Sequence, residues 1–152
     1  MKTNNIIAAI FIALTGTAFV ACDETDGISV VPVLDKITLE PNLPAPGDSI
    51  TATAHQAVKG KLINATTYNW QFTYWTQADD GSTVKVDTLL SQHTNYDGEY
   101  NGDPYMGYRL PTTIVPGSSI MITINASYSC SGQTAQGALY GSANKTQSFS
   151  IK

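Results

Sequence analysis

Apolar and polar residues alternate along most of this chain, and a period of two residues is typical of β-strands with one buried face. The clearest run covers residues 120–130, where isoleucines, alanine, tyrosine and cysteine occupy every second position. A second run places four aromatic side chains on one face of residues 68–74. Sustained helical periodicity is absent, so the pattern predicts strands throughout. Shorter alternating segments cover residues 37–39, 50–54, 84–90, 108–110 and 147–151.

Turn-forming residues separate these segments and predict how the strands connect. Residues 79–82 (DDGS) are a hairpin signal, because Asp-Gly favours the tight turns that join antiparallel strands. Several short strands at regular spacing predict an all-β fold, a single antiparallel β-sandwich of about seven to eight strands. We expect one domain over residues 34–152. Further turns are expected at residues 41–48, 59–61, 116–117 and 131–132.

The N-terminal segment differs from the rest of the chain. Lys2 precedes an uncharged run over residues 6–20, which is shorter than the about 20 apolar residues of a membrane span and has the length of a signal-peptide core. Residues 19–22 (FVAC) follow and resemble a lipobox, the cleavage site of bacterial lipoproteins, although Phe19 departs from the usual aliphatic residue. The alternative is an ordinary secretory signal with a chance cysteine.

The resemblance implies three regions and a location. Residues 1–21 would be a cleaved lipoprotein signal peptide, Cys22 the acylated N-terminus, and residues 22–33 an acidic tether. The acidic residues after Cys22 resemble the surface-export signal of some Gram-negative anaerobes. We therefore expect an outer-membrane protein, anchored by lipid and displayed at the cell surface. The alternative for these residues is a solvated linker.

The composition of the chain limits the classes of partner and the disulfides that it can form. Removing Lys2 with the leader leaves seven of the eight basic residues against 12 acidic ones, and no basic stripe, which argues against nucleic acid. If Cys22 is acylated, Cys130 is the only other cysteine, so no intramolecular disulfide can form. We expect Cys130 to be buried and reduced.

Four segments together resemble an immunoglobulin-like or polycystic-kidney-disease-type sandwich domain. They are residues 46–54, residues 68–70, residues 126–130 and a last strand ending at Ile151. The resemblance makes Trp70 the core tryptophan and Tyr128-x-Cys130 the tyrosine-corner and cysteine pair, while Ala52 or Ala54 stands where a partner cysteine would sit. The residues expected in the core are Trp70, Phe72, Ile122, Ile124 and Tyr128.

Catalytic signals are weak. The chain has two histidines, His55 and His93, and no nucleophile motif around any serine. We expect both histidines at the surface and predict that the protein is not an enzyme. A small hydrolase is the third choice, and a paired-carboxylate glycosidase is disfavoured because no insertion is available to build a cleft.

Oxygen-bearing side chains occupy alternate positions in residues 97–103 (DGEYNGD), with a glycine sixth. This partly resembles an EF-hand calcium loop, although Tyr108 replaces the closing glutamate. Calcium is the one cofactor considered, and a plain polar loop is the alternative. The expected ligands are Asp97, Glu99, Asn101 and Asp103.

Aromatic residues gather in the same segment. Sugar rings stack on exposed aromatic side chains, so residues 92–108 are a candidate glycan- or protein-binding loop. The alternative is that the tyrosines pack the loop onto the sandwich. The expected ligand-binding residues are Trp75, Tyr96, Tyr100, Asn101, Tyr105 and Tyr108.

Two tripeptides, residues 48–50 (DSI) and 87–89 (DTL), resemble the O-glycosylation acceptor of the same anaerobes, which would modify Ser49 and Thr88. Taken together, the sequence predicts a surface lipoprotein that acts as a binding or adhesion module, accessory to glycan capture. Its partners would be the membrane and either a glycan or another surface protein. The alternative is a structural subunit of a larger outer-membrane assembly.

Overall fold

The computed structural model describes residues 27–95 and 102–152. Alternating residues produce strands along almost the whole of this length, and the described part contains no α-helix. The predicted signal peptide, Cys22 and the centre of the predicted binding loop lie outside the described residues. The strands are β1 (Val33–Glu40), β2 (Ser49–Val58), β3 (Ile63–Gln77), β4 (Thr83–Asn95), β5 (Tyr105–Arg109), β6 (Ser119–Cys130) and β7 (Tyr140–Ser150).

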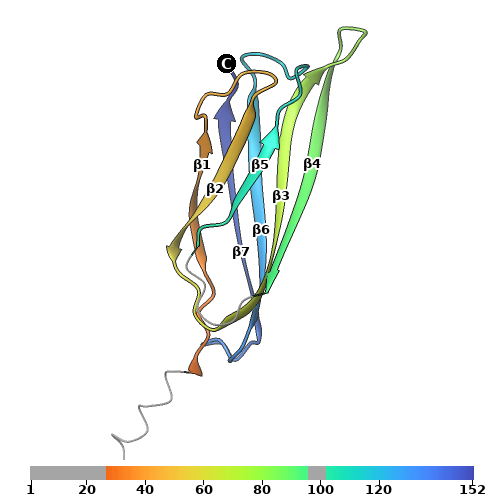
Figure 1. Cartoon of the computed structure of the whole chain (residues 1–152). Coiled ribbons are helices and arrows are strands. Elements are labelled where there is room, and N and C mark those ends of the chain that lie inside the picture. The colour runs from red at the N-terminus through yellow and green to blue at the C-terminus, as the bar shows by residue number, and fades with distance from the viewer. Residues whose placement is uncertain (1–26, 96–101) are drawn as a thin grey trace, which may run out of the picture.

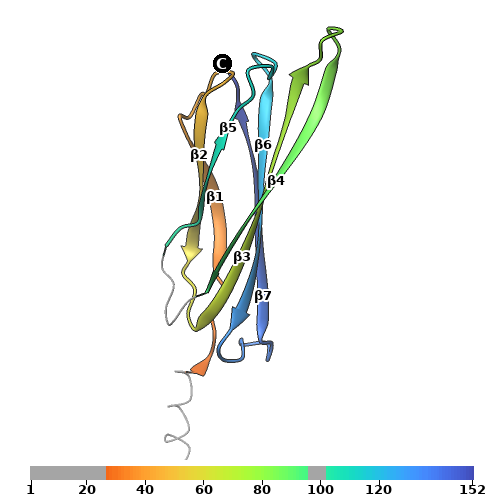
Figure 2. The same cartoon turned by 45° about the vertical axis from the view of Figure 1, so that its right-hand side comes forward.

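The strands form two antiparallel sheets that pack as a sandwich (Figures 1 and 2). One sheet has the order β1-β2-β5 and the other has the order β4-β3-β6-β7. The predicted antiparallel β-sandwich is therefore confirmed, with seven strands. The fourth strand lies beside the third, whereas constant-type immunoglobulin domains place it in the other sheet.

The core lies between the sheets and is built from the inward halves of the alternating strands. Trp70 and Phe72 on β3 and Ile122 and Ile124 on β6 are fully buried. The Tyr128 ring meets Tyr68 edge to face, with the ring centroids 6.3 Å apart. The five predicted core residues are thus confirmed, and their burial supplies the main stabilising term of the fold.

Cys130 closes the core at the end of β6. Its thiol is free and only 6 % of the residue is exposed, so the predicted burial is confirmed. Burial raises the pKa of the Cys130 thiol, because a thiolate is poorly solvated there. Ala52 and Ala54 on β2 are also fully buried, in line with the small residues expected opposite the tryptophan.

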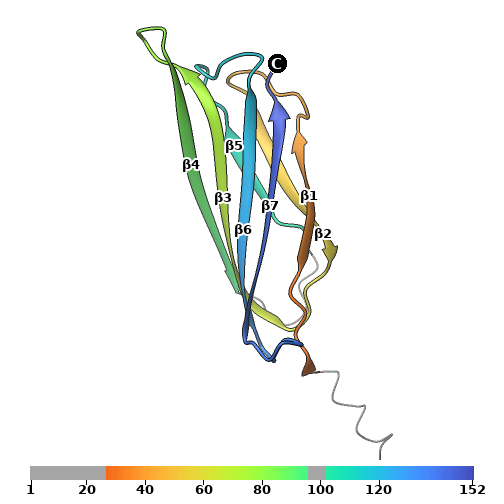
Figure 3. The same ribbon diagram turned by 180° about the vertical axis from the view of Figure 1, so that it is seen from behind.

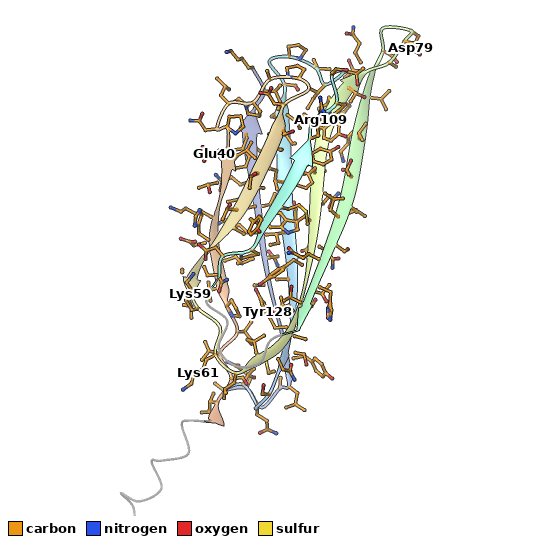
Figure 4. The ribbon with its side chains drawn as sticks, viewed as in Figure 1. Glu40, Lys59, Lys61, Asp79, Arg109 and Tyr128 are labelled. Carbon is orange, nitrogen blue, oxygen red and sulfur yellow. The ribbon has the colours of Figure 1, made fainter. Side chains whose placement is uncertain are left out.

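The sandwich is elongated along its strands and has two different ends. The N-terminal pole consists of residues 27–32, the turn at residues 59–62 and the loop at residues 131–139, and Figure 4 labels Lys61 there. The hairpin pole carries the β3–β4 turn, with Asp79 labelled in Figure 4. At that turn Gly81 has a φ of +82°, a conformation that glycine adopts without strain.

Residues 29 and 30, which the sequence analysis assigns to a tether, contact the fold. Ser29 is 3 % exposed, and its hydroxyl donates to the carbonyl oxygen of Gly132 at 2.8 Å. The backbones of Val30 and Lys61 exchange two hydrogen bonds of 3.0 Å. The chain therefore joins the fold by residue 29, because these backbone groups find partners on two neighbouring loops.

Candidate functional site

The outer face of the four-stranded sheet is almost free of charge. Successive residues of a strand point to opposite faces of the sheet. In β3 and β6 the residues that point inward are mainly apolar and those that point outward are mainly polar. We call the outward side chains along the middle of β3, β6 and β7 the amide–hydroxyl face. Its residues are Thr67, Asn69, Gln71, Thr73, Met121, Thr123, Asn125, Ser127, Ser142, Asn144, Thr146 and Ser148.

Register places like side chains in rows across this face. Asn69 lies opposite Asn125, which lies opposite Asn144, so three amides cross the sheet side by side. The next row brings together Gln71, Thr123 and Thr146, and the two threonine hydroxyls are 2.9 Å apart. A flat row of amides and hydroxyls offers donors and acceptors at the spacing of neighbouring strands, about 4.8 Å.

Hydrogen bonds fix the side of this face next to β4. Ser91 donates to Asn69 at 2.6 Å, and the Thr67 hydroxyl lies 2.9 Å from Nδ1 of His93. The side chains of Asn125 and Asn144 have no hydrogen-bond partner among the described residues. The centre of the face therefore keeps two amides available for an external ligand.

A single ion pair borders the face. Lys85 Nζ lies 3.6 Å from the Asp87 carboxylate, which also accepts from the Thr73 hydroxyl at 2.5 Å. The Thr73 hydrogen bond, together with weaker ones from Gln71 and the nearby Lys85, lowers the pKa of the Asp87 carboxyl. Because the two charges neutralise one another, a ligand at the face meets a nearly neutral surface.

Exposed aromatic side chains flank the face at both ends of the sheet. Trp75 lies on the outward side of β3 toward the hairpin pole and is 45 % exposed. Tyr140, at the start of β7, is 73 % exposed and pairs with Ser129 at the N-terminal pole. The sequence analysis names Trp75 as a ligand-binding residue, but the rows of amides and hydroxyls beside it depend on strand register and were not predicted.

The structure does not bring the described ligand-binding candidates together. Tyr105 is 64 % exposed on the outer face of the other sheet, because it pairs with the outward Thr53. Tyr108 faces the interior, where its ring stacks on Phe72 with centroids 4.7 Å apart. Trp75 and Tyr105 therefore lie on opposite faces. The remaining candidates, Tyr96, Tyr100 and Asn101, lie outside the described residues.

Tyr108 is part of the packing. Its hydroxyl lies 2.6 Å from the Tyr74 hydroxyl and 3.3 Å from that of Thr88. Burial raises the pKa of the Tyr108 phenol. For Tyr108 the alternative of a packed loop tyrosine is correct, because residues 105–109 form a strand whose even-numbered side chains point inward.

The expected calcium ligand Asp103 already has three partners. Its carboxylate lies 2.6 Å from Lys59 Nζ and 3.0 Å from His55 Nδ1, and it accepts from the Gln56 amide at 3.1 Å. Burial works against ionisation, but these hydrogen bonds and the Lys59 charge outweigh it and lower the pKa of the Asp103 carboxyl. The described residues contain no group of three or more metal-ligating side chains.

The three other expected calcium ligands, Asp97, Glu99 and Asn101, lie outside the described residues. A calcium ion at Asp103 would have to compete with Lys59, which already neutralises the carboxylate.

Both ring nitrogens of His55 have a side-chain partner within hydrogen-bond distance. Its Nε2 lies 2.8 Å from the Thr38 hydroxyl while Nδ1 faces Asp103. The order hydroxyl, imidazole, carboxylate is that of hydrolytic triads. Thr38, however, is exposed in the middle of β1 and pairs with Thr53, so its hydroxyl lies on an open sheet surface. The group links β1, β2 and the segment before β5.

The two predicted O-glycosylation residues differ in accessibility. Ser49 is exposed at the start of β2. Thr88 points inward from β4, where its hydroxyl lies 3.3 Å from the Tyr74 hydroxyl as well as from that of Tyr108. Ser49 is therefore open to a modifying enzyme, whereas a glycan on Thr88 would have to displace this tyrosine pair.

Comparisons with known proteins assign no family to this chain. No family model and no curated protein matches the chain. One similar solved structure is a Paenibacillus sp. cycloisomaltooligosaccharide glucanotransferase complexed with cycloisomaltoheptaose, at 17 % identity and a TM-score of 0.47, covering 80 % of this chain and 14 % of that one. Another is Spo0M, a sporulation control protein from Bacillus subtilis, at 14 % identity and a TM-score of 0.41, covering 81 % and 50 %.

This chain thus spans a small part of the glucanotransferase and half of Spo0M. In residues 27–95 and 102–152 we find no helix with the length and apolarity needed to cross a bilayer.

Proposed function

We propose that the protein is a non-enzymatic binding and adhesion module, held at the outer surface of the outer membrane by acyl chains on Cys22. Its ligand in this proposal is an uncharged glycan, captured on the amide–hydroxyl face. The observation that carries the proposal is the row of three asparagines across β3, β6 and β7, two of which have open amides.

The chemistry of the face suits a neutral sugar. Amides and hydroxyls both donate and accept, which matches the hydroxyls of a sugar ring. An anionic or cationic ligand would find no net opposite charge, because the bordering Lys85 and Asp87 neutralise one another. Trp75 adds an exposed indole on which a ring can stack at one end of the rows.

The predicted lipid anchor supports a role outside the cell. The leader and Cys22 resemble those of a lipoprotein, and the described chain joins the fold at Ser29, only seven residues after Cys22. Acyl chains on Cys22 would then hold the sandwich close to the membrane by its N-terminal pole, and the amide–hydroxyl face would run along its side.

The test is a polysaccharide array probed with the soluble chain from Asp23 onward, which retains all seven strands. We expect selective binding of neutral polysaccharides. Replacing Asn125 and Asn144 together by alanine removes two hydrogen-bonding amides, which at about 1 kcal/mol each weakens binding roughly 30-fold. The matched pair Trp75→Ala and Tyr105→Ala removes one exposed aromatic from each outer face, and only Trp75→Ala should reduce binding.

Two outcomes contradict the proposal. If no neutral polysaccharide binds, the ligand is of another class, and crosslinking on intact cells would identify a protein partner. If Tyr105→Ala abolishes binding and Trp75→Ala does not, the ligand occupies the other sheet. Circular dichroism of each variant establishes that the fold is retained.

A further inference from the structure

The outer edge of β4 is unpaired among the described residues. β4 (Thr83–Asn95) pairs with β3 along all 13 of its residues, and the pairing shows no register shift. It lies along one margin of the molecule, as Figures 1 and 3 show from opposite sides. The strand contains no proline. Its backbone groups therefore form a long, regular row open to another strand.

The other three edge strands carry the features that discourage such pairing. β1 has two register shifts and three charged residues. β5 is five residues long. β7 carries Lys145 at its middle, and its Gln147 side chain accepts a hydrogen bond of 3.0 Å from the Ile37 amide on β1. β4 also carries Lys85 and Asp87, but it is the longest of the four edge strands and its pairing has no register shift, so it offers the most extensive open edge.

The centre of β4 is apolar as well as exposed. Leu89 is the seventh of the 13 residues, and 71 % of it is exposed on the outward side, opposite Gln71. Flanking it at equal distances are Asp87 and Ser91, then Lys85 and His93. An apolar side chain at the midpoint of an open edge is suited to a contact with its own copy.

We propose that β4 pairs with β4 of a second copy, antiparallel and with Leu89 on the twofold axis. In this register Leu89 meets Leu89 and Asp87 meets Ser91. Lys85 meets His93, so no lysine faces a lysine and no aspartate faces an aspartate across the contact. Each copy also keeps its own Lys85–Asp87 ion pair. The contact is isologous, so it closes at two copies.

The backbone supplies the main attraction. Thirteen paired residues of an antiparallel ladder exchange about a dozen hydrogen bonds, against about ten in a standard protein interface. The paired edge would be about 44 Å long at 3.4 Å per residue. The two four-stranded sheets become one continuous sheet of eight strands, and the two Leu89 side chains cover part of one another's apolar surface.

The antiparallel arrangement has a consequence for anchored copies, which rests on the lipid anchor of the proposed function. β4 runs between the two poles, so the N-terminal poles of paired copies point in opposite directions (Figure 1). Copies held in one membrane share one orientation and cannot pair in this way. Copies in two facing membranes can, so the contact is a homophilic adhesion between cells.

The first experiment measures the mass of the soluble chain from Asp23 onward by analytical ultracentrifugation. We expect a dimer for the wild type and a monomer for Leu89→Lys, which places two lysines on the axis. Leu139→Lys, a similar change at an exposed leucine of the N-terminal pole, should remain dimeric. Because Leu89 is exposed, the melting temperature of Leu89→Lys should match that of the wild type at a dilution where both chains are monomeric.

The second experiment tests the register. Leu89→Cys brings two thiols to directly opposed positions, with Cβ atoms about 5 Å apart, and oxidised glutathione should convert the variant to a covalent dimer. Thr146→Cys, outward on the opposite edge strand, is the control and should remain monomeric under denaturing conditions. Cys130 is buried and does not interfere.

A monomeric wild type at about 100 μM, a concentration that populates weak specific dimers, would overturn the proposal. So would a dimeric Leu89→Lys, or equal crosslinking of Leu89→Cys and Thr146→Cys. A monomeric chain that still binds polysaccharide would refute the pairing alone, and a dimer that binds none would refute only the glycan.

Discussion

At the scale of single residues, the Asp103 carboxylate is the side chain whose polar contacts we expect to contribute to stability. Its carboxylate contacts the side chains of Lys59 and His55 and accepts a hydrogen bond from the backbone N–H of Gln56. These contacts connect the segment before β5 to β2 and the turn that follows it. Asp103→Asn removes the charge that two of these groups face. We expect the free energy of unfolding at pH 7 to fall by about 1–2 kcal/mol, measured by urea denaturation.

The pH dependence of this loss has a defined sign. The pKa of Asp103 is lower in the folded protein than in the unfolded chain, so its contribution is present above about pH 4, the ordinary value for aspartate. The contribution is lost as the pH falls through the folded-state pKa. The stability gap between wild type and Asp103→Asn should therefore narrow at pH 3. A gap that stays constant would mean that the charge is immaterial.

The sequence predicts buried residues better than polar contacts. Trp70, Ile122 and Cys130 were placed correctly because alternation alone fixes which face they occupy. His55 and Asp103, by contrast, are 48 positions apart in the sequence and meet only because strand pairing brings their segments together. Polar networks of this kind depend on register, which a single sequence does not specify.

At the scale of elements, the N-terminal segment is held by two glycines on other strands and loops. A Cβ on Gly132 would overlap the carbonyl oxygen of Gly27, and one on Gly141 would overlap the Val31 side chain. Gly132→Ala should therefore lower the free energy of unfolding by about 1–3 kcal/mol, by forcing residues 27–29 off the loop. Chemical denaturation measures the loss.

Gly27→Ala is the matched control, because a Cβ there meets no atom within 4 Å. Limited proteolysis adds a local readout, since a displaced segment exposes the backbone around Ser29. Equal stability of Gly132→Ala and Gly27→Ala would show that the segment contributes nothing to the fold.

Strand prediction succeeded where the alternation is long and failed where tertiary pairing extends a strand. Residues 120–130 match β6 to within one residue, whereas the aromatic stripe at residues 68–74 covers only the middle of β3. β5 begins within a segment that the sequence reads as a polar, glycine-rich loop, at residues 105–107, and β4 and β7 also extend beyond their predicted ranges. There, pairing with a neighbouring strand supplies hydrogen bonds that local composition does not reveal. The contacts of Ser29 and Val30 with neighbouring loops were not predicted for the same reason.

At the scale of the whole molecule, the two poles should differ in accessibility on the cell. From Cys22 to Ser29 the chain can extend at most about 25 Å, at roughly 3.5 Å per residue. Acylated Cys22 would therefore hold the N-terminal pole near the bilayer, while Asp79 lies at the other pole (Figure 4). The loop at Ala135 belongs to the N-terminal pole and is exposed in the isolated domain.

Cysteines introduced at these two sites report the orientation, because Cys130 is buried and its raised pKa leaves little reactive thiolate. On intact cells, a polyethylene-glycol maleimide should label Asp79→Cys several-fold faster than Ala135→Cys. In the purified soluble chain the two rates should be equal, which separates membrane shielding from local structure. Equal labelling on cells would contradict anchoring at this pole. Labelling of both sites only after the outer membrane is permeabilised would place the domain on the periplasmic side, where pairing between cells through β4 is impossible.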